Sequence, residues 1–117
     1  MITIGQLADW IITNRRDKAF KDYSKEKIID ELNTCANSLS MLYVTNESDE
    51  ITGVVCCKND SIARVLYVYD ILATKPGVIK HMLQYFLNNF PQYKLEGINR
   101  NGRKRTFNNP IKLYKRI

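Results

Sequence analysis

The stretch "RVLYVYDILATKPGVIKHMLQYF", residues 64–86, places an apolar run, a short turn and an amphipathic segment in direct succession. The run at 64–73 is rich in branched and aromatic residues and has no turn signal inside it, so it predicts a central strand. After Pro76 and Gly77, apolar residues recur at helical spacing, and Pro91 ends the helix because proline disfavours a helical residue before it. The apolar stripe of this helix consists of Ile79, Met82, Leu83, Phe86, Leu87 and Phe90.

Two further helices are expected before this stretch. The tetrapeptide "TIGQ" at 3–6 has the T-x-x-Q form of a capping box, and the apolar spacing after it predicts a helix at 4–14. Ser24 is suited to cap a second helix that ends near Asn37.

The remaining elements are expected to be strands. Two β-rich runs, 41–45 and 51–58, are separated by the polar "NESDE" and predict a hairpin, which a loop at 59–61 connects to the central strand. Beyond the main helix we expect a strand at 93–99, an irregular basic segment at 100–110 and a closing strand at 111–117. The order ααβββαβ(loop)β predicts an α/β (α+β) fold with a mixed sheet, in a single domain that spans residues 1–117.

Composition narrows the class of protein. The chain has 117 residues, of which 44% are hydrophobic and 26% charged, as in ordinary soluble globular domains. No apolar run is long enough to span a membrane and the N-terminus has no secretory pattern, so a cytoplasmic protein is expected, or a virion protein if a phage encodes it. Three cysteines without CxxC spacing indicate free thiols, and with a single histidine they do not predict a metal site.

The positive charge is concentrated at the C-terminal end. Residues 92–117 contain eight basic residues and one acidic residue, whereas the whole chain carries a net charge of only +6. A basic quarter on a near-neutral body indicates an anionic partner, such as a phosphate-bearing cofactor, nucleic acid or an acidic protein surface. A solvated basic face that only aids solubility is the alternative.

The element order resembles the GNAT fold of the Gcn5-related N-acetyltransferases, in the manner of small phage-encoded members. In that family the strands before and after the main helix splay apart and acetyl-CoA lies in the gap. Its pyrophosphate is held by backbone amides of a loop of the form R/Q-x-x-G-x-G/A. Gly77 matches the middle glycine of that loop, whereas Thr74 and Ile79 depart from it and Pro76 removes an amide.

The resemblance therefore implies a degenerate acetyl-CoA loop. Its residues would be Leu72, Ala73, Thr74, Lys75, Gly77, Val78 and Ile79. The family's last helix, which often carries a proton-donating tyrosine, has no room in the interval 100–110.

Amine acetylation needs a base for the ammonium group and an acid for the departing thiolate. Asp70, near the turn at Pro76 and Gly77, is the first candidate for the base and Glu96 the second. Tyr69 is a candidate for the acid, together with Tyr67 and Tyr114. Each residue has a structural alternative, since Asp70 also suits a turn cap or a lysine partner and tyrosines are common in strands. The function expected from the resemblance is an N-acetyltransferase or a non-catalytic descendant that still binds acetyl-CoA.

A rival function uses the basic C-terminal quarter. The segment "NRNGRKRTF" interleaves basic residues with an aromatic one, a composition suited to phosphate contacts and base stacking. This predicts a nucleic-acid-binding or virion- or complex-associated phage protein whose anion-binding residues are Arg100, Arg103, Lys104 and Arg105. The same side chains would also suit the 3′-phosphate of CoA.

Overall fold

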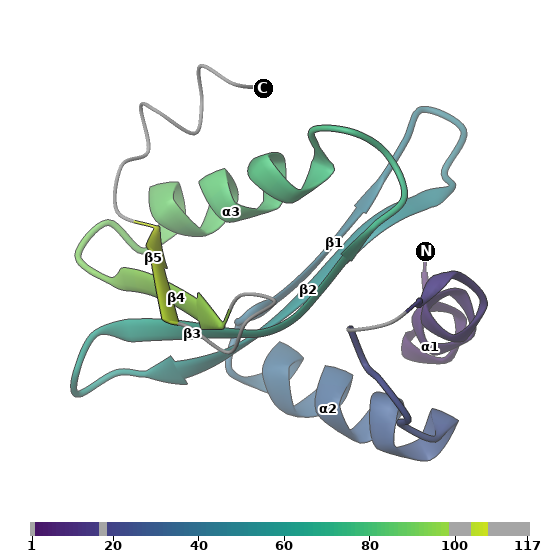
Figure 1. The fold of residues 1–117 in the computed structure, drawn as a ribbon, viewed down its shortest axis with the longest axis horizontal. Coiled ribbons are helices and arrows are strands. Elements are labelled where there is room, and N and C mark those ends of the chain that lie inside the picture. Colours follow the sequence, from purple (N-terminus) through teal and green to yellow (C-terminus); the bar gives the residue numbers. More distant parts are fainter. Residues whose placement is uncertain (1, 17–18, 99–103, 108–117) are drawn as a thin grey trace.

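The computed structural model describes residues 2–16, 19–98 and 104–107, which form an α+β fold with three helices and a five-stranded mixed sheet (Figure 1). The observed order of elements confirms the predicted fold class. In chain order the elements are α1 (Ile4–Asn14), α2 (Lys25–Asn37), β1 (Met41–Thr45), β2 (Ile51–Asp60), β3 (Val65–Ala73), α3 (Val78–Asn89), β4 (Lys94–Ile98) and β5 (Lys104–Phe107).

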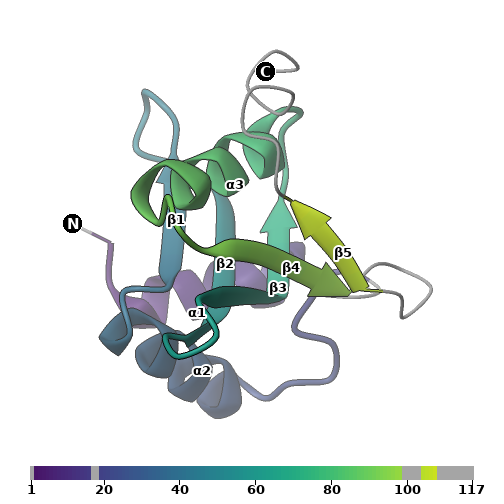
Figure 2. The same cartoon turned by 90° about the vertical axis from the view of Figure 1, so that its left-hand side faces the viewer.

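The strands lie in the order β1-β2-β3-β4-β5, which is also their order along the chain. All neighbouring pairs are antiparallel except β3 and β4, which are parallel because α3 crosses over between them. The sheet twists strongly, so that β1 and β4 run in clearly different directions (Figure 2). β3 is the middle strand, as its uninterrupted apolar run predicted.

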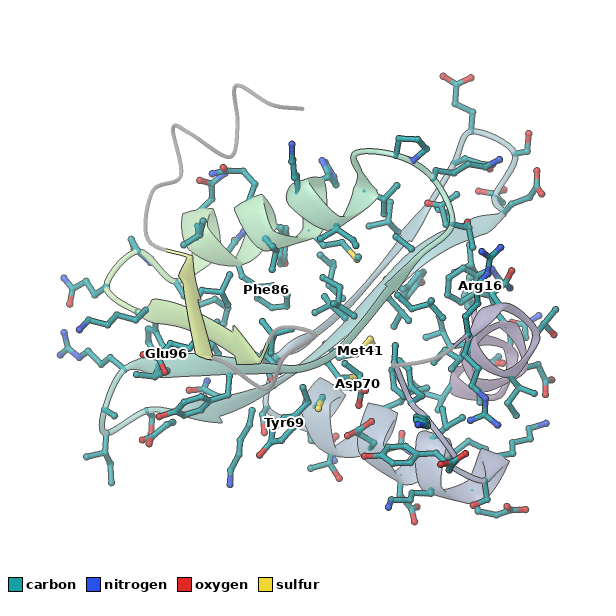
Figure 3. The ribbon with its side chains drawn as sticks, viewed as in Figure 1. Arg16, Met41, Tyr69, Asp70, Phe86 and Glu96 are labelled. Atoms are coloured by element: carbon teal, nitrogen blue, oxygen red, sulfur yellow. The ribbon has the colours of Figure 1, made fainter. Side chains whose placement is uncertain are left out.

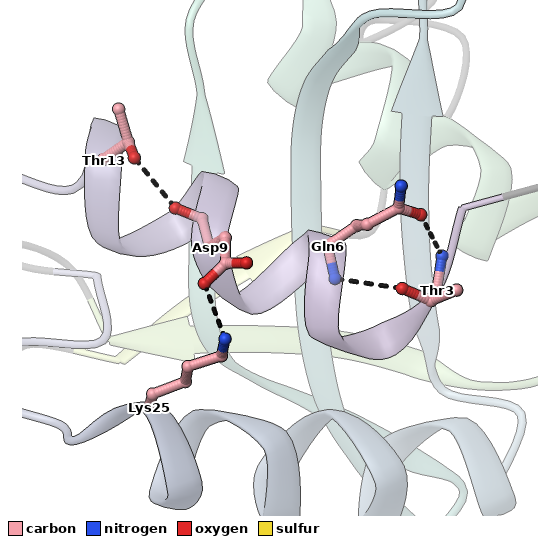
Figure 4. Close-up of polar contacts among 5 residues, drawn as sticks. All are labelled: Thr3, Gln6, Asp9, Thr13 and Lys25. Atoms are coloured by element: carbon pink, nitrogen blue, oxygen red, sulfur yellow. Dashed lines mark hydrogen bonds and ion pairs between the residues drawn. The ribbon is translucent and has the colours of Figure 1, made fainter.

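Local capping explains where the first two helices begin. Thr3 Oγ1 accepts the Gln6 amide at 3.1 Å, and Gln6 Oε1 accepts the Thr3 amide at 2.8 Å, which completes the predicted capping box (Figure 4). Ser24 Oγ accepts the amide of Lys27 at the start of α2. Lys25 then forms an ion pair with Asp9 across the two helices at 2.8 Å.

Helices cover both faces of the sheet. α1 and α2 pack on one face, where Leu7, Ile11, Ile28 and Leu32 meet the strand residues Val54 and Cys56. α3 packs alone on the other face (Figure 1). There the buried residues are Val55, Cys57, Leu66, Met82, Leu83, Phe86 and Leu95.

Three expectations about the strands and the main helix were wrong in detail. β2 continues to Asp60 and pairs with Val65, so the loop of the β2–β3 hairpin lies at 61–64 and not at 59–61. Asp60 Oδ1 accepts the Ala63 amide and stabilises this tight turn. On α3, Ile79 is 43% exposed although it belongs to the predicted apolar stripe, whereas Gln84, which lies outside that stripe, is buried.

The last expected elements also changed. Four residues of the segment predicted to be irregular, Lys104–Phe107, form β5 and pair with β4. The strand predicted at 111–117 lies outside the described residues. Within the described part of the chain, no helix has the length and apolarity needed to cross a bilayer.

Candidate functional site

The first part of the candidate site is the seam, the loop of residues 74–77 that connects β3 to α3. Gly77 caps α3 in the left-handed conformation, with φ of 82°, and no side chain caps this end of the helix. A Cβ atom added at Gly77 would meet nothing within 4 Å, so the space beside the seam is open. The amides of Ile79 and Lys80 have no acceptor within the helix because they belong to its first turn. The seam therefore presents free N–H groups and the positive end of a helix dipole to one open space.

The strands on either side of α3 meet over only part of their length. β4 pairs with Val65, Leu66, Tyr67 and Val68 of β3, and within the described residues no pair with β4 follows. The rest of β3, up to Ala73, pairs with β2 alone. The edge of β3 that faces away from β2 is thus not covered by β4 over the half of the strand that leads into the seam.

Several residues predicted to bind the cofactor mainly build the seam. The amide of Thr74 donates to Thr52 O at 3.0 Å, which ties the start of the loop to β2. Val78 packs beside Gly53, where an added Cβ would lie only 2.5 Å from Val78 Cγ1 and 3.0 Å from Met82 Cε. Gly53 therefore allows the N-terminus of α3 to approach the sheet, a requirement that sequence patterns did not reveal.

The other predicted cofactor residues take different positions. Leu72 packs toward α1 and α2, whereas Ala73 packs toward α3, as the alternation of a strand requires. Lys75 and Gly77 are exposed in the loop. Ile79 is also exposed, so its side chain does not fill the seam from inside.

The three predicted catalytic residues share one face of the sheet, the face on which α1 and α2 pack. A β-bulge makes this possible on β3: Cys56 of β2 pairs with Asp70 and Cys57 pairs with Val68, so Tyr69 is an extra residue. Tyr69 and Asp70 therefore both lie on the α2 side, opposite Phe86 (Figure 3). On β4, Glu96 alternates with Leu95, which packs toward α3, so Glu96 also belongs to the α2 side.

Asp70 is engaged in the structure. It is only 9% exposed, and its Oδ1 accepts the amide of Phe20 at 2.8 Å. The carboxyl of Glu31, on α2, lies close enough to hydrogen-bond Asp70. Burial raises the pKa of Glu31 to about 8, with the hydrogen bond and the negative charge of Asp70 acting in the same direction. At neutral pH the Glu31 carboxyl therefore keeps its proton and can donate it to Asp70.

Sequence reasoning missed Glu31 and Phe20. Glu31 has the ordinary appearance of a charged residue on an amphipathic helix, and no motif marks Phe20. Only the tertiary contact between α2, β3 and the segment before α2 brings them to Asp70. The long sequence separation of this contact, 50 residues between Phe20 and Asp70, explains why no local signal exists.

Two thiols lie next to the carboxyl pair. A hydrogen bond with Cys56 lowers the pKa of Cys35, despite the opposing effects of burial and of Asp70. The same hydrogen bond and burial raise the pKa of Cys56. All three cysteines are buried and free, and among the described residues no group of three or more His, Cys, Asp or Glu side chains could hold a metal ion.

An open hollow lies on this face where the hairpin of β2 and β3 turns. Its lining includes the exposed Ile62 and Tyr69, which is 58% exposed. The other lining residues are Lys58, Asn59, Asp60, Ser61 and Tyr67. Tyr69 therefore lies between this hollow and the carboxyl pair.

The predicted anion-binding residues are only partly covered. Lys104 and Arg105 belong to β5, where they pair with Ile98 and Gly97. Arg100 and Arg103 lie outside the described residues.

No protein-family model, curated protein or solved structure matches the chain.

Proposed function

We propose that the protein binds acetyl-CoA at the seam between β3 and α3, as a GNAT-like N-acetyltransferase or as a descendant that binds the cofactor without catalysis. One observation carries the proposal: the parallel strands β3 and β4 pair only at their beginnings, and the open part of β3 leads to an uncapped helix N-terminus. An extended ligand with a phosphate group at one end suits this arrangement.

Each part of acetyl-CoA would have a complementary group. The pyrophosphate would accept hydrogen bonds from the amides of Ile79 and Lys80, with added attraction from the Lys75 and Lys80 ammonium groups. The pantetheine arm, which carries amide groups, would pair with the free edge of β3. The acetyl group would then lie at the other end of this free edge, away from the seam and close to Tyr69 and Asp70.

The chemistry of transfer would take place on the face that carries the candidate catalytic residues. An acceptor amine, after losing a proton to a carboxylate, would attack the thioester carbonyl, and the thiolate that leaves would take a proton from Tyr69. Asp70 already accepts the Phe20 amide, so Glu96 is the less committed base. A descendant that binds without transfer would keep the seam and lose this proton relay.

Thermal unfolding with and without acetyl-CoA tests the proposal. A ligand at 100 times its dissociation constant adds about 2.7 kcal/mol of stability, which raises the midpoint of a domain of this size by several degrees. Gly77→Trp should abolish the shift, because the indole would fill the open space beside the amides. Gly77→Asn is the matched control, since asparagine tolerates the left-handed conformation and leaves most of that space open. No shift at millimolar acetyl-CoA would overturn the proposal.

Release of free CoA in the presence of amines separates the two forms of the proposal. A transferase should release CoA with an acceptor, and Tyr69→Phe and Glu96→Gln should slow the release while the thermal shift remains. A shift without release would indicate binding alone.

The concentration of charge in residues 92–117 favours a second candidate, binding of nucleic acid through the basic C-terminal quarter. Affinity for an oligonucleotide should then fall steeply with salt, because each phosphate contact releases a counterion. Replacing Arg100, Arg103 and Arg105 by glutamate should abolish binding and leave any acetyl-CoA shift unchanged. Binding that does not depend on salt would contradict this candidate.

A further inference from the structure

Asp70, which lies beside Glu31, accepts a hydrogen bond from a strained segment of the chain. Phe20 is fully buried, yet its φ of 57° lies in the left-handed region, which is unfavourable for a phenylalanine. Such a conformation persists only where surrounding contacts enforce it. Phe20 also packs its ring edge-on against Tyr23, with ring centroids 6.4 Å apart.

Polar contacts supply that enforcement from two sides. Arg15 Nη1 donates to the carbonyl oxygens of Phe20 at 2.8 Å and Tyr23 at 2.7 Å. From the sheet, Asp70 accepts the Phe20 amide at 2.8 Å in a buried contact. The backbone of Phe20 is therefore held at both its C=O, by Arg15, and its N–H, by Asp70. The Asp70 carboxylate is the group of the sheet that makes this contact.

That carboxylate has a second acid beside it. Glu31 Oε2 is buried and accepts no hydrogen bond from the described residues. Two ionised carboxylates cannot donate to each other, whereas a proton on Glu31 supplies a donor to Asp70. One proton thus decides whether the pair attracts or repels.

We propose that Glu31 and Asp70 form a proton-dependent latch, which holds the segment Ala19–Ser24 against β3 while the pair shares a proton and loosens the segment when both carboxyls are ionised. The latch shares Asp70 with the neighbourhood proposed for the acetyl group, but it does not require acetyl-CoA to bind. Because Tyr69 lies beside Asp70 on the same face, opening of the segment would change the surface next to Tyr69 (Figure 3).

The groups around Glu31 set the direction of the response. Asp70 from β3 and Cys35 from α2 disfavour its ionisation, whereas Lys27 from α2 favours it. Tyr23 from the held segment and Cys56 from β2 also face the pair. Burial raises the pKa of Tyr23, and the hydrogen bond with Cys35 and burial raise the pKa of Cys56; the charges of Glu31 and Asp70 act in the same direction on both. Lys27 Nζ lies 4.2 Å from the centroid of the Tyr23 ring, so the lysine charge interacts with the segment as well as with Glu31.

The sign follows from the raised pKa of Glu31. The folded protein keeps the proton up to about pH 8, whereas the unfolded chain loses it near the ordinary value of 4.5. Stability from the retained proton is therefore complete below the ordinary value and is lost as the pH rises through about 8. The latch is expected to be closed in neutral solution and to loosen in mildly alkaline solution.

Amide hydrogen exchange of the full chain, followed residue by residue between pH 6 and 9 and corrected for intrinsic exchange, tests the latch. Protection of the Phe20 amide should fall about tenfold across this range in the wild-type protein, as local opening of the segment becomes easier. Glu31→Gln keeps a donor for Asp70 and cannot ionise, so its Phe20 protection should stay constant. Glu26→Gln, an exposed position on the same helix, is the control and should behave as the wild type.

Two results would overturn the proposal. One is a wild-type Phe20 amide whose corrected protection does not change with pH, and the other is an equal fall in Glu31→Gln. If Glu31→Gln does not fold, the carboxyl signal of Glu31 in labelled wild-type protein serves instead. It should titrate near pH 8 together with the loss of Phe20 protection, and titration near the ordinary value would contradict the latch.

Discussion

The two faces of the sheet are stabilised in different ways. The α3 face is closed by one helix whose buried residues are nearly all apolar, with Phe86 at its centre and Gly53 allowing close approach. The α1 and α2 face has an apolar core of its own, and it also buries Asp70 and Ser40. Ser40 Oγ donates to the carbonyl of Cys57 at 2.7 Å, so on this face hydrogen bonds as well as packing connect the helices and loops to the sheet.

The difference has a consequence for chemistry. The stability of an apolar face does not depend on pH, and a substitution there changes stability mainly through the volume of the buried side chains. A face that buries carboxyls depends on protons as well. The residues that we propose for acyl transfer and for the latch lie on the second face, whereas α3 supplies a rigid support whose N-terminus forms the seam.

The largest effect is expected on the apolar face. Phe86→Ala should lower the free energy of unfolding by about 3–5 kcal/mol, because a fully buried ring is replaced by a cavity. Urea unfolding measures this change. Tyr85→Ala, at the neighbouring and 45% exposed position, should cost below about 1 kcal/mol. Equal losses in the two variants would contradict the assigned orientation of α3.

Close packing of α3 on β2 gives the next largest effect. Gly53→Ala should destabilise the protein by about 1–3 kcal/mol, because the new Cβ would overlap Val78. Gly5→Ala is the control, since its Cβ would approach nothing nearer than Thr3 Oγ1 at 3.9 Å, and alanine favours a helix by up to about 1 kcal/mol. The two variants should therefore shift the thermal midpoint in opposite directions, and shifts of the same sign would weaken the packing argument.

On the polar face, the hydrogen bond between Asp70 and Phe20 can be removed in two steps. Asp70→Ala leaves the buried Phe20 amide without an acceptor and should cost about 1–3 kcal/mol. Asp70→Asn retains an oxygen at the same place and should cost less. Chemical denaturation of both variants at neutral pH measures the difference. If alanine were tolerated as well as asparagine, the amide would not depend on this carboxylate.

The smallest effect separates the faces by pH. Between pH 5 and pH 9 the wild-type protein should lose about 1 kcal/mol of stability relative to Glu31→Gln, because Glu31 retains its proton in the folded state up to about pH 8. This loss of stability is smaller than the full pKa difference alone would give, because solvent screens the charge of a half-buried carboxyl. Denaturation curves at several pH values measure it. The Phe86→Ala variant should show the wild-type pH dependence, and parallel curves for wild type and Glu31→Gln would speak against the shared proton.

Local patterns predicted most of the fold. The capping residues Thr3 and Ser24 begin α1 and α2 where the sequence indicated, because a cap is decided by residues three positions apart. The apolar run before Thr74 became the middle strand. The errors occurred where pairing with another strand decided the outcome, as in the extension of β2 to Asp60 and the formation of β5.

The candidate site was less predictable than the fold. The sequence placed Tyr69, Asp70 and the Gly77 seam in one neighbourhood, because they lie within ten residues of one another. It did not predict that Tyr69 would turn to the same side as Asp70, since that depends on a bulge in the pairing with β2. Nor did it predict the exposure of Ile79, because a period of 3.6 residues does not show which edge of an apolar stripe the sheet covers.

The sequence by itself determined the order of helices and strands, the central position of β3 and the start of α3 at Gly77. These features depend on interactions between residues near one another in the chain, which leave a periodic or positional pattern. Only the tertiary structure decided that Gly53 admits α3 and that Glu31, Asp70 and Phe20 meet on the opposite face. Those contacts join residues far apart in the chain, so the raised pKa of Glu31 is a property of the folded molecule.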